Sequence, residues 1–82
     1  MITQPYRLCV ERHDPSQNVA RFYGMAIEPT LLGEVSLTRR WGRIGSRGHA
    51  TQHSFACEDD AVVAFLSLLR QKRQRGYRPP EK

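Results

Sequence analysis

Residues 58–77 have the sequence EDDAVVAFLSLLRQKRQRGY, and their pattern indicates the fold class. The apolar residues recur at spacings of three and four, which predicts an amphipathic α-helix with one face on a core. Three acids open the segment and four basic residues lie near its end, as the helix macrodipole favours. Gly76 is a natural C′ residue at the helix end, and Tyr77 supplies the apolar contact that often follows a C′ glycine. We therefore expect one helix from Glu58, ending at Gly76.

The residues before this helix alternate between apolar and polar side chains, with the period of two that is typical of strands. Strands are expected at 6–12, 21–28, about 34–40 and 49–55. Gly24 lies inside the second of them and suggests a bulge or a close backbone approach. About four strands followed by one helix predict an α+β fold. Its antiparallel sheet would rest one face on the helix and expose the other to water.

The chain has 82 residues, 39% hydrophobic and 26% charged, so we expect a single globular domain over 1–82. Its core is expected at 6–77, with a disordered tail at 78–82 that contains two prolines. No apolar run reaches the ~20 residues that a membrane span needs. The N-terminus also lacks the pattern of a secretory signal. We therefore expect a cytoplasmic protein without a membrane partner.

Thirteen basic residues stand against eight acidic ones, which gives a net charge of +5 at neutral pH. Eleven of the thirteen are arginine, whose planar guanidinium suits bidentate contact with phosphate or carboxylate. Ten of the thirteen basic residues fall in residues 39–47 and 70–82. If these segments meet in space, they form one basic surface that suits a nucleic-acid partner. The alternative is a solvated loop, a frayed tail and charges that stabilise the helix end.

Residues 40–45, RWGRIG, carry the most specific chemistry. Trp41 is the single tryptophan, and its indole offers a flat face on which a sugar or base can stack. Guanidinium groups beside it can grip phosphate oxygens, and glycines allow a ligand to approach the backbone. Gly42, Gly45 and Gly48 also predict a loop with unusual backbone angles. The candidate nucleic-acid contacts are Trp41, Gly42, Arg43, Arg40, Arg39, Arg47 and Lys72.

The orientation of these side chains stays open at this point. Trp41 shares its strand parity with Val35 and Leu37, so strict alternation places it on the apolar face unless a bulge or the glycine loop redirects it. Arg39 and Arg40 point to opposite faces, so at most one of them joins Trp41. Lys72 lies on the apolar side of the helix and is expected to extend its ammonium over the core edge towards the sheet end. The charges of Arg73 and Arg75 are expected to belong to the helix end, and Tyr23 to be a half-buried sheet residue.

No catalytic or metal-binding set is found in the sequence. Cys9 and Cys57 lie far apart and are expected to be small buried hydrophobic residues. His49 and His53 would share a strand face, but two histidines without a third ligand make a poor zinc site. The acids at 58–60 are explained by the helix start. We expect no metal, no cofactor and no enzymatic activity.

The chain resembles the WGR domain, a module named for its Trp-Gly-Arg core and found in DNA-damage-responsive poly(ADP-ribose) polymerases and in small stand-alone bacterial proteins. The resemblance extends over residues 6–77, and His49 departs from a polar amide that is common there. The matching residues are Tyr6 and Leu8, Arg21-Phe22-Tyr23, Trp41-Gly42-Arg43-Ile44-Gly45 and Gly48, then Ala61, Phe65, Leu69, Lys72 and Gly76-Tyr77.

The resemblance implies an antiparallel sheet with one helix, and binding of nucleic acid, notably at DNA ends and breaks. It implies that Trp41 stacks near a terminal nucleotide and that Arg43 supports the contact with the backbone. In the polymerases the module also relays DNA binding to a catalytic domain, and no such domain is present in these 82 residues. We predict a non-enzymatic nucleic-acid-binding module, with DNA favoured over RNA. The alternative is an adaptor whose basic face docks an acidic protein partner or a larger enzyme.

Overall fold

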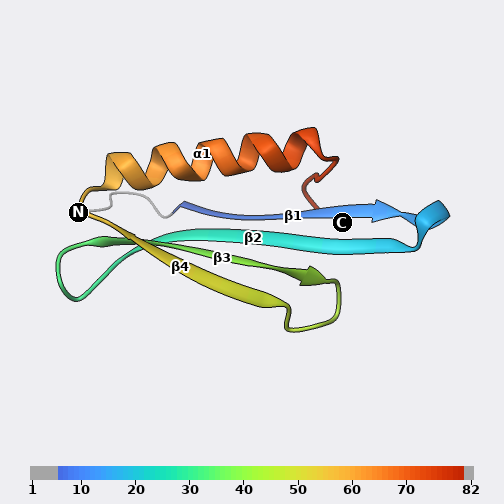
Figure 1. Cartoon of the computed structure of the whole chain (residues 1–82), viewed down its shortest axis with the longest axis horizontal. Coiled ribbons are helices and arrows are strands. Elements are labelled where there is room, and N and C mark those ends of the chain that lie inside the picture. The colour runs from blue at the N-terminus through green and yellow to red at the C-terminus, as the bar shows by residue number, and fades with distance from the viewer. Residues whose placement is uncertain (1–5, 81–82) are drawn as a thin grey trace.

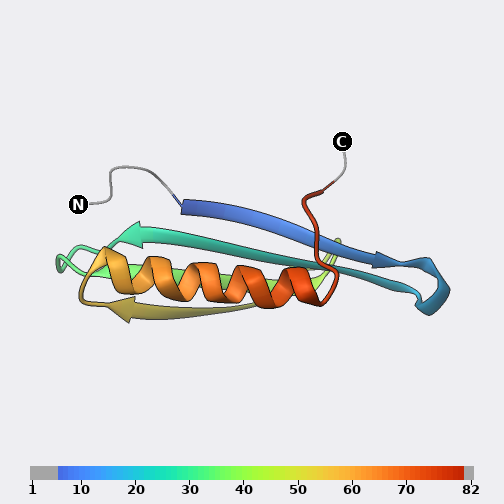
Figure 2. The same ribbon diagram turned by 90° about the horizontal axis from the view of Figure 1, so that it is seen from above.

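The computed structural model describes residues 6–80 and shows a four-stranded antiparallel sheet with one helix on one face (Figures 1 and 2). The strand order is β1-β2-β3-β4, so each strand pairs with its neighbours in the chain. This arrangement confirms the predicted α+β class. The elements are β1 (Tyr6–Asp14), the short 3-10 helix η1 (Pro15–Gln17), β2 (Val19–Pro29), β3 (Val35–Arg43), β4 (His49–Phe55) and α1 (Glu58–Gln74).

The core lies between α1 and the sheet, where strand alternation places the apolar side chains. Val10, Tyr23, Ile27 and Leu37 are each at most 2% exposed on the side of the sheet that faces α1. The helix adds Phe65, and it packs against β2, β3 and β4. Burying an aromatic or branched side chain contributes roughly 1.5–3 kcal/mol. A single layer of such residues therefore supplies the hydrophobic stabilisation of this small domain.

Gly24 is part of a regular ladder, and the predicted bulge is wrong. Cys9 and Arg40 stand opposite Gly24 in unbroken antiparallel registers with β1 and β3. A Cβ at this position would meet its nearest atom, the Leu8 carbonyl oxygen, at 3.6 Å, which is an ordinary contact. The glycine therefore marks neither a bulge nor a close approach. Unbroken ladders pair β2 with its neighbours on both sides.

The end of α1 is fixed by a Schellman motif. The Gly76 N–H donates to the Arg73 carbonyl at 3.1 Å, and the Tyr77 N–H donates to the Lys72 carbonyl at 3.0 Å. Gly76 adopts a φ of 95°, in the left-handed region that glycine tolerates best. The Tyr77 side chain is buried against the sheet, where its ring lies 6.4 Å from that of Tyr23. The predicted C′ glycine and its apolar contact are confirmed.

Beyond α1 the chain crosses to the outer edge of β1. The Glu11 N–H donates to the Arg78 carbonyl at 2.7 Å, and the Arg78 N–H donates to the Glu11 carbonyl at 2.8 Å. This bridge ties the segment after α1 to β1. It places Arg78, the first residue of the predicted disordered tail, against the sheet. Residues 81–82 of that tail lie outside the described residues.

Both cysteines are exposed, so the prediction that they are buried is wrong. Cys9 follows the alternation of β1, which turns it away from α1 because its neighbour Val10 is in the core. Among the elements of residues 6–80, none forms a second layer over that face of the sheet. Cys57 is the N-cap of α1 and projects no side-chain hydrogen bond onto the helix.

Candidate nucleic-acid interface

Trp41 lies on the helix-facing side of the sheet. Strand β3 continues without a bulge to Arg43, so the alternation that buries Val35 and Leu37 also fixes the face of Trp41. Tyr23 stands opposite Trp41 on one side and His49 on the other. The His49 ring centroid is 5.9 Å from that of Trp41, with the planes tilted by 36°. Trp41 is half-buried at the edge of the core, and part of its indole remains accessible.

This edge of the core is open because the sheet is longer than its helix. Figure 1 shows the β1–β2 hairpin extending past the C-terminal end of α1. A hollow of about 610 Å³ lies here, and its lining includes Arg21, Trp41, Arg43 and His49 together with hairpin residues 17–20. The open end of the helix-facing side is therefore both aromatic and basic.

The loop after β3 folds directly back on Trp41. Gly48 has a φ of 68°, and a Cβ there would overlap the Trp41 carbonyl and lie 2.9 Å from the Phe22 ring. A Cβ at Gly42 would lie 2.6 Å from the Gly48 Cα. Gly42 itself belongs to β3 and has no positive φ, so the predicted loop begins later than expected. The two glycines allow the close packing that holds the backbone of Trp41 in place.

Only one of the two adjacent arginines before Trp41 reaches it. The guanidinium carbon of Arg39 is 5.6 Å from the centroid of the Trp41 ring and 6.0 Å from that of Tyr23. Arg40 is exposed on the opposite face of the sheet. At most one arginine was predicted to join Trp41, and the structure identifies it as Arg39. Arg47 is exposed in the loop between β3 and β4.

Lys72 approaches the same place from α1. Its ammonium lies 4.5 Å from the centroid of the Tyr23 ring and 5.4 Å from that of Tyr77. Burial lowers the pKa of Lys72, and the neighbouring charges of Arg75 and Arg39 lower it further. Because Tyr23 pairs with Trp41, the lysine and Arg39 converge on one group of aromatic rings. An anion at this point would offset the repulsion between the cations.

Two buried polar atoms in this cluster have no hydrogen-bond partner within residues 6–80: the Tyr23 hydroxyl and the Arg39 Nε. Burial raises the pKa of Tyr23 more than Arg39 lowers it, so the hydroxyl keeps its proton at neutral pH. The described chain has two side-chain ion pairs, Arg7–Glu28 at 2.9 Å and His13–Glu11 at 3.1 Å. Neither involves Arg39 or Lys72, so no carboxylate of residues 6–80 neutralises this cluster.

The sequence did not identify two further arginines at the open end. Arg12 stands opposite Arg21 in the β1–β2 ladder, and Arg21 stands opposite Arg43 in the β2–β3 ladder. All three lie on the face that carries Val10, Tyr23 and Trp41. The sequence predicted no sheet face for Arg12 or Arg21, and it placed Arg43 beyond the predicted end of its strand. Their alignment depends on the register between strands, which is a non-local property.

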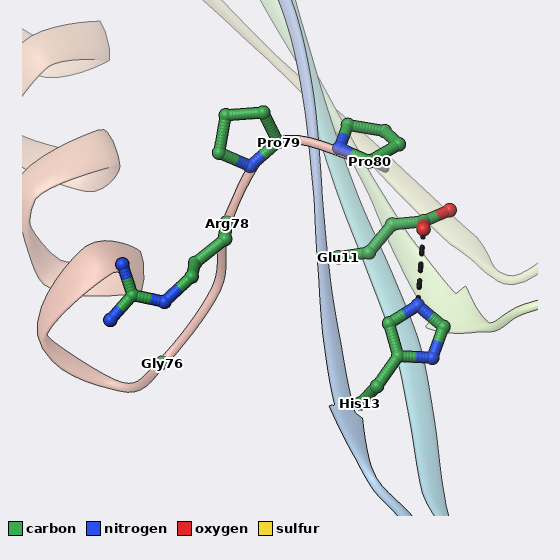
Figure 3. A pocket seen from close by; sticks show the side chains of 6 residues that line it. All are labelled: Glu11, His13, Gly76, Arg78, Pro79 and Pro80. Carbon is green, nitrogen blue, oxygen red and sulfur yellow. Dashed lines mark hydrogen bonds and ion pairs between the residues drawn. The ribbon is translucent and has the colours of Figure 1, made fainter. Parts of the chain in front are cut away.

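A second hollow, of about 540 Å³, lies beside the outer edge of β1. Its lining includes the Glu11–His13 ion pair and residues 78–80 (Figure 3). The Arg78 side chain points towards the end of α1, away from that pair (Figure 3). The hollow is lined by the Glu11 carboxylate, which already contacts His13, and by two prolines and one arginine. It therefore gathers neither unpaired charge nor aromatic surface. Trp41 and the cations around it are the better candidate.

Within 6–80, no three His, Cys, Asp or Glu side chains are grouped so that they could hold a metal ion. The helix in this range is too short and too polar to cross a membrane.

A family model described as the WGR domain matches residues 6–82. An uncharacterized protein of Sinorhizobium fredii is 63% identical over 79 residues. The alignment covers 96% of this chain and 39% of the relative, so the chain spans less than half the length of the curated relative that it matches. No solved structure matches the chain.

Proposed function

Because this chain belongs to the WGR domain family, we propose that it is a non-catalytic module that binds nucleic acid, with DNA favoured over RNA. Its contacts are made through phosphates and through stacking on Trp41. One observation carries the proposal: at the uncovered end of the sheet, Arg39 lies over the chain's single tryptophan and Lys72 lies over the neighbouring Tyr23, and neither cation has a carboxylate partner in residues 6–80.

Each part of the cluster has a separate role in this proposal. Arg43 is exposed beside Trp41 and takes a phosphate oxygen. Arg39 and Lys72 lie deeper, so they supply positive potential beneath the bound phosphate. The accessible part of the indole stacks on a sugar or base, an interaction worth about 1–3 kcal/mol for each base. Arg40 faces the other side of the sheet and has no part in the site.

Phosphate contacts of this kind predict weak sequence preference and a strong dependence on salt. The side chains proposed to contact the ligand are arginine, lysine and tryptophan, all of which act on any sequence. Preference for DNA ends over continuous duplex is a further part of the proposal, and it follows from the family resemblance alone. Equal affinity for a nicked and an intact duplex would contradict that part.

Fluorescence anisotropy of labelled DNA tests the proposal with matched variants. We expect Arg43→Gln to weaken binding by about tenfold, as loss of one charged hydrogen bond of roughly 1.5 kcal/mol implies. Trp41→Phe should weaken it by a smaller factor. Arg40→Gln removes the same charge three residues away on the opposite face, and its affinity should stay within twofold of the unmodified protein. No binding at low salt, or equal losses in Arg43→Gln and Arg40→Gln, would contradict the proposed site.

A further inference from the structure

We propose that Arg12, Arg21 and Arg43 form a phosphate track, along which consecutive phosphates of one nucleic-acid strand cross β3, β2 and β1. The inference rests on the proposed function and extends it. Three phosphates are held, one by each arginine, and the bound strand runs across the β-strands and not along them. The inference also assigns a binding role to Arg12 and Arg21.

The register of the sheet creates the track. Arg12 pairs with Arg21, and Arg21 pairs with Arg43, so the three Cα atoms lie in one row across three strands. Neighbouring positions in such a row are about 5 Å apart, and their side chains stand on the same face. The adjacent row contains Val10, Tyr23 and Trp41. A strand held by the arginines therefore passes beside the indole, with a base in reach of it.

The row is unfavourable without a ligand. Like charges that stand directly opposite each other in a sheet destabilise it, and this row has two such pairs in succession. Neither ion pair of residues 6–80 includes any of the three arginines. A polyanion laid across the row removes the repulsion, because each guanidinium then faces a phosphate.

Arg12 has a partial structural explanation that the other two lack. A Cβ on Gly76 would lie 3.9 Å from the Arg12 Nε, so this arginine reaches the C-terminal end of α1. The negative end of the helix macrodipole favours a cation there. Arg21 and Arg43 are both exposed and line the open hollow instead. Arg21 is therefore the most informative residue for a test.

The shape of the open end agrees with a strand that crosses the sheet. The end of α1 closes one side of the row, since Gly76 lies beside Arg12. The tip of the β1–β2 hairpin, at residues 17–20, lines the other side of the hollow. Between them the row stays open on the helix-facing side of the sheet. The proposed nucleic-acid strand lies in this opening and runs across the β-strands.

The salt dependence of binding to a single-stranded oligonucleotide counts the contacts. A single strand gives a slope of log K against log salt of about −0.7 for each neutralised phosphate. We would measure this slope by anisotropy with labelled decathymidylate for the unmodified protein, Arg12→Gln, Arg21→Gln and Arg43→Gln. Each substitution should make the slope shallower by about 0.7. Arg40→Gln, with the same change in net charge on the other face, should leave the slope unchanged.

The outcomes separate this inference from the proposed function. If Arg43→Gln and Trp41→Phe weaken binding while Arg21→Gln keeps the full slope, the track is wrong and the site at Trp41 stands. If Arg40→Gln lowers the slope as much as Arg21→Gln, net charge alone governs binding and the track is again wrong. If the unmodified protein does not bind any nucleic acid at low salt, both fail. Thermal melts check folding, and Arg21→Gln should melt no lower than the unmodified protein because it relieves repulsion.

Discussion

Replacing Gly48 by alanine should damage the domain far more than the same change at Gly45. Both glycines have a positive φ, 68° at Gly48 and 93° at Gly45. A left-handed backbone costs a residue with a Cβ about 1–2 kcal/mol, so both substitutions carry this penalty. At Gly45 nothing lies within 4 Å of the new Cβ. At Gly48 the Cβ would overlap the Trp41 carbonyl and crowd the Phe22 ring at 2.9 Å.

The overlap adds a steric cost, taken as the roughly 1–3 kcal/mol of an overpacked site, because backbone and an aromatic ring must shift. Gly48→Ala should therefore lower the free energy of unfolding by about 2–5 kcal/mol, against about 1–2 kcal/mol for Gly45→Ala. A domain of 82 residues has a total of only about 4–12 kcal/mol. In a domain of this size each kcal/mol shifts the melting temperature by about 4–8 °C.

Urea and thermal denaturation followed by circular dichroism would measure the difference. The emission of Trp41 gives a local signal, because the displaced carbonyl belongs to this residue and it is the single tryptophan. Gly48→Ala should change the folded-state emission, whereas Gly45→Ala should not. Equal melting temperatures for the two variants would refute the packing argument, since backbone strain would then account for both.

Three further outcomes follow from the same contacts. Tyr77→Ala should lower the free energy of unfolding by about 3–5 kcal/mol in urea titrations, as for other large buried aromatics, while Leu31→Ala, at a fully exposed position, should stay within about 0.5 kcal/mol. Cys57→Ser should raise the melting temperature, because it gives the N-cap of α1 a hydroxyl acceptor worth roughly 1 kcal/mol where no side-chain cap now exists. Raising the pH through the lowered pKa of Lys72 should weaken nucleic-acid binding, because the neutral amine no longer attracts phosphate. In Lys72→Arg this loss of affinity should disappear, because arginine stays charged.

Local patterns predicted the elements of this fold well. The three- and four-residue spacing from Glu58, together with Gly76 and Tyr77, gave the helix and the way it ends. The alternation at 49–55 gave β4 with its observed ends. Strand β3 runs three residues beyond its predicted end at 40 because β2 pairs with it as far as Arg43. That extension depends on contacts between segments distant in the chain, which local periodicity does not contain.

In the candidate site too, local patterns predict some features, and the others depend on contacts between distant segments. Parity alone places Trp41 beside the apolar face and separates Arg39 from Arg40, provided that β3 has no bulge. The packing of Gly42 on Gly48 keeps that strand regular, and it appears only once the loop is folded. The row that joins Arg12 and Arg21 to Arg43 requires two strand registers, which depend on turn geometry and core packing. Cys9 is exposed because α1 covers only one face of the sheet and Cys9 lies on the other.

Titration of the tryptophan emission with unlabelled DNA would show whether Trp41 lies at the nucleic-acid interface. The measurement needs no label, because Trp41 alone emits as tryptophan. We predict that a short oligonucleotide quenches or shifts this emission at low salt, that the midpoint moves to higher concentration as salt rises, and that Arg43→Gln moves it further. Binding that anisotropy detects but that leaves the emission of Trp41 unchanged at every salt concentration would contradict the claim that this residue lies in the interface.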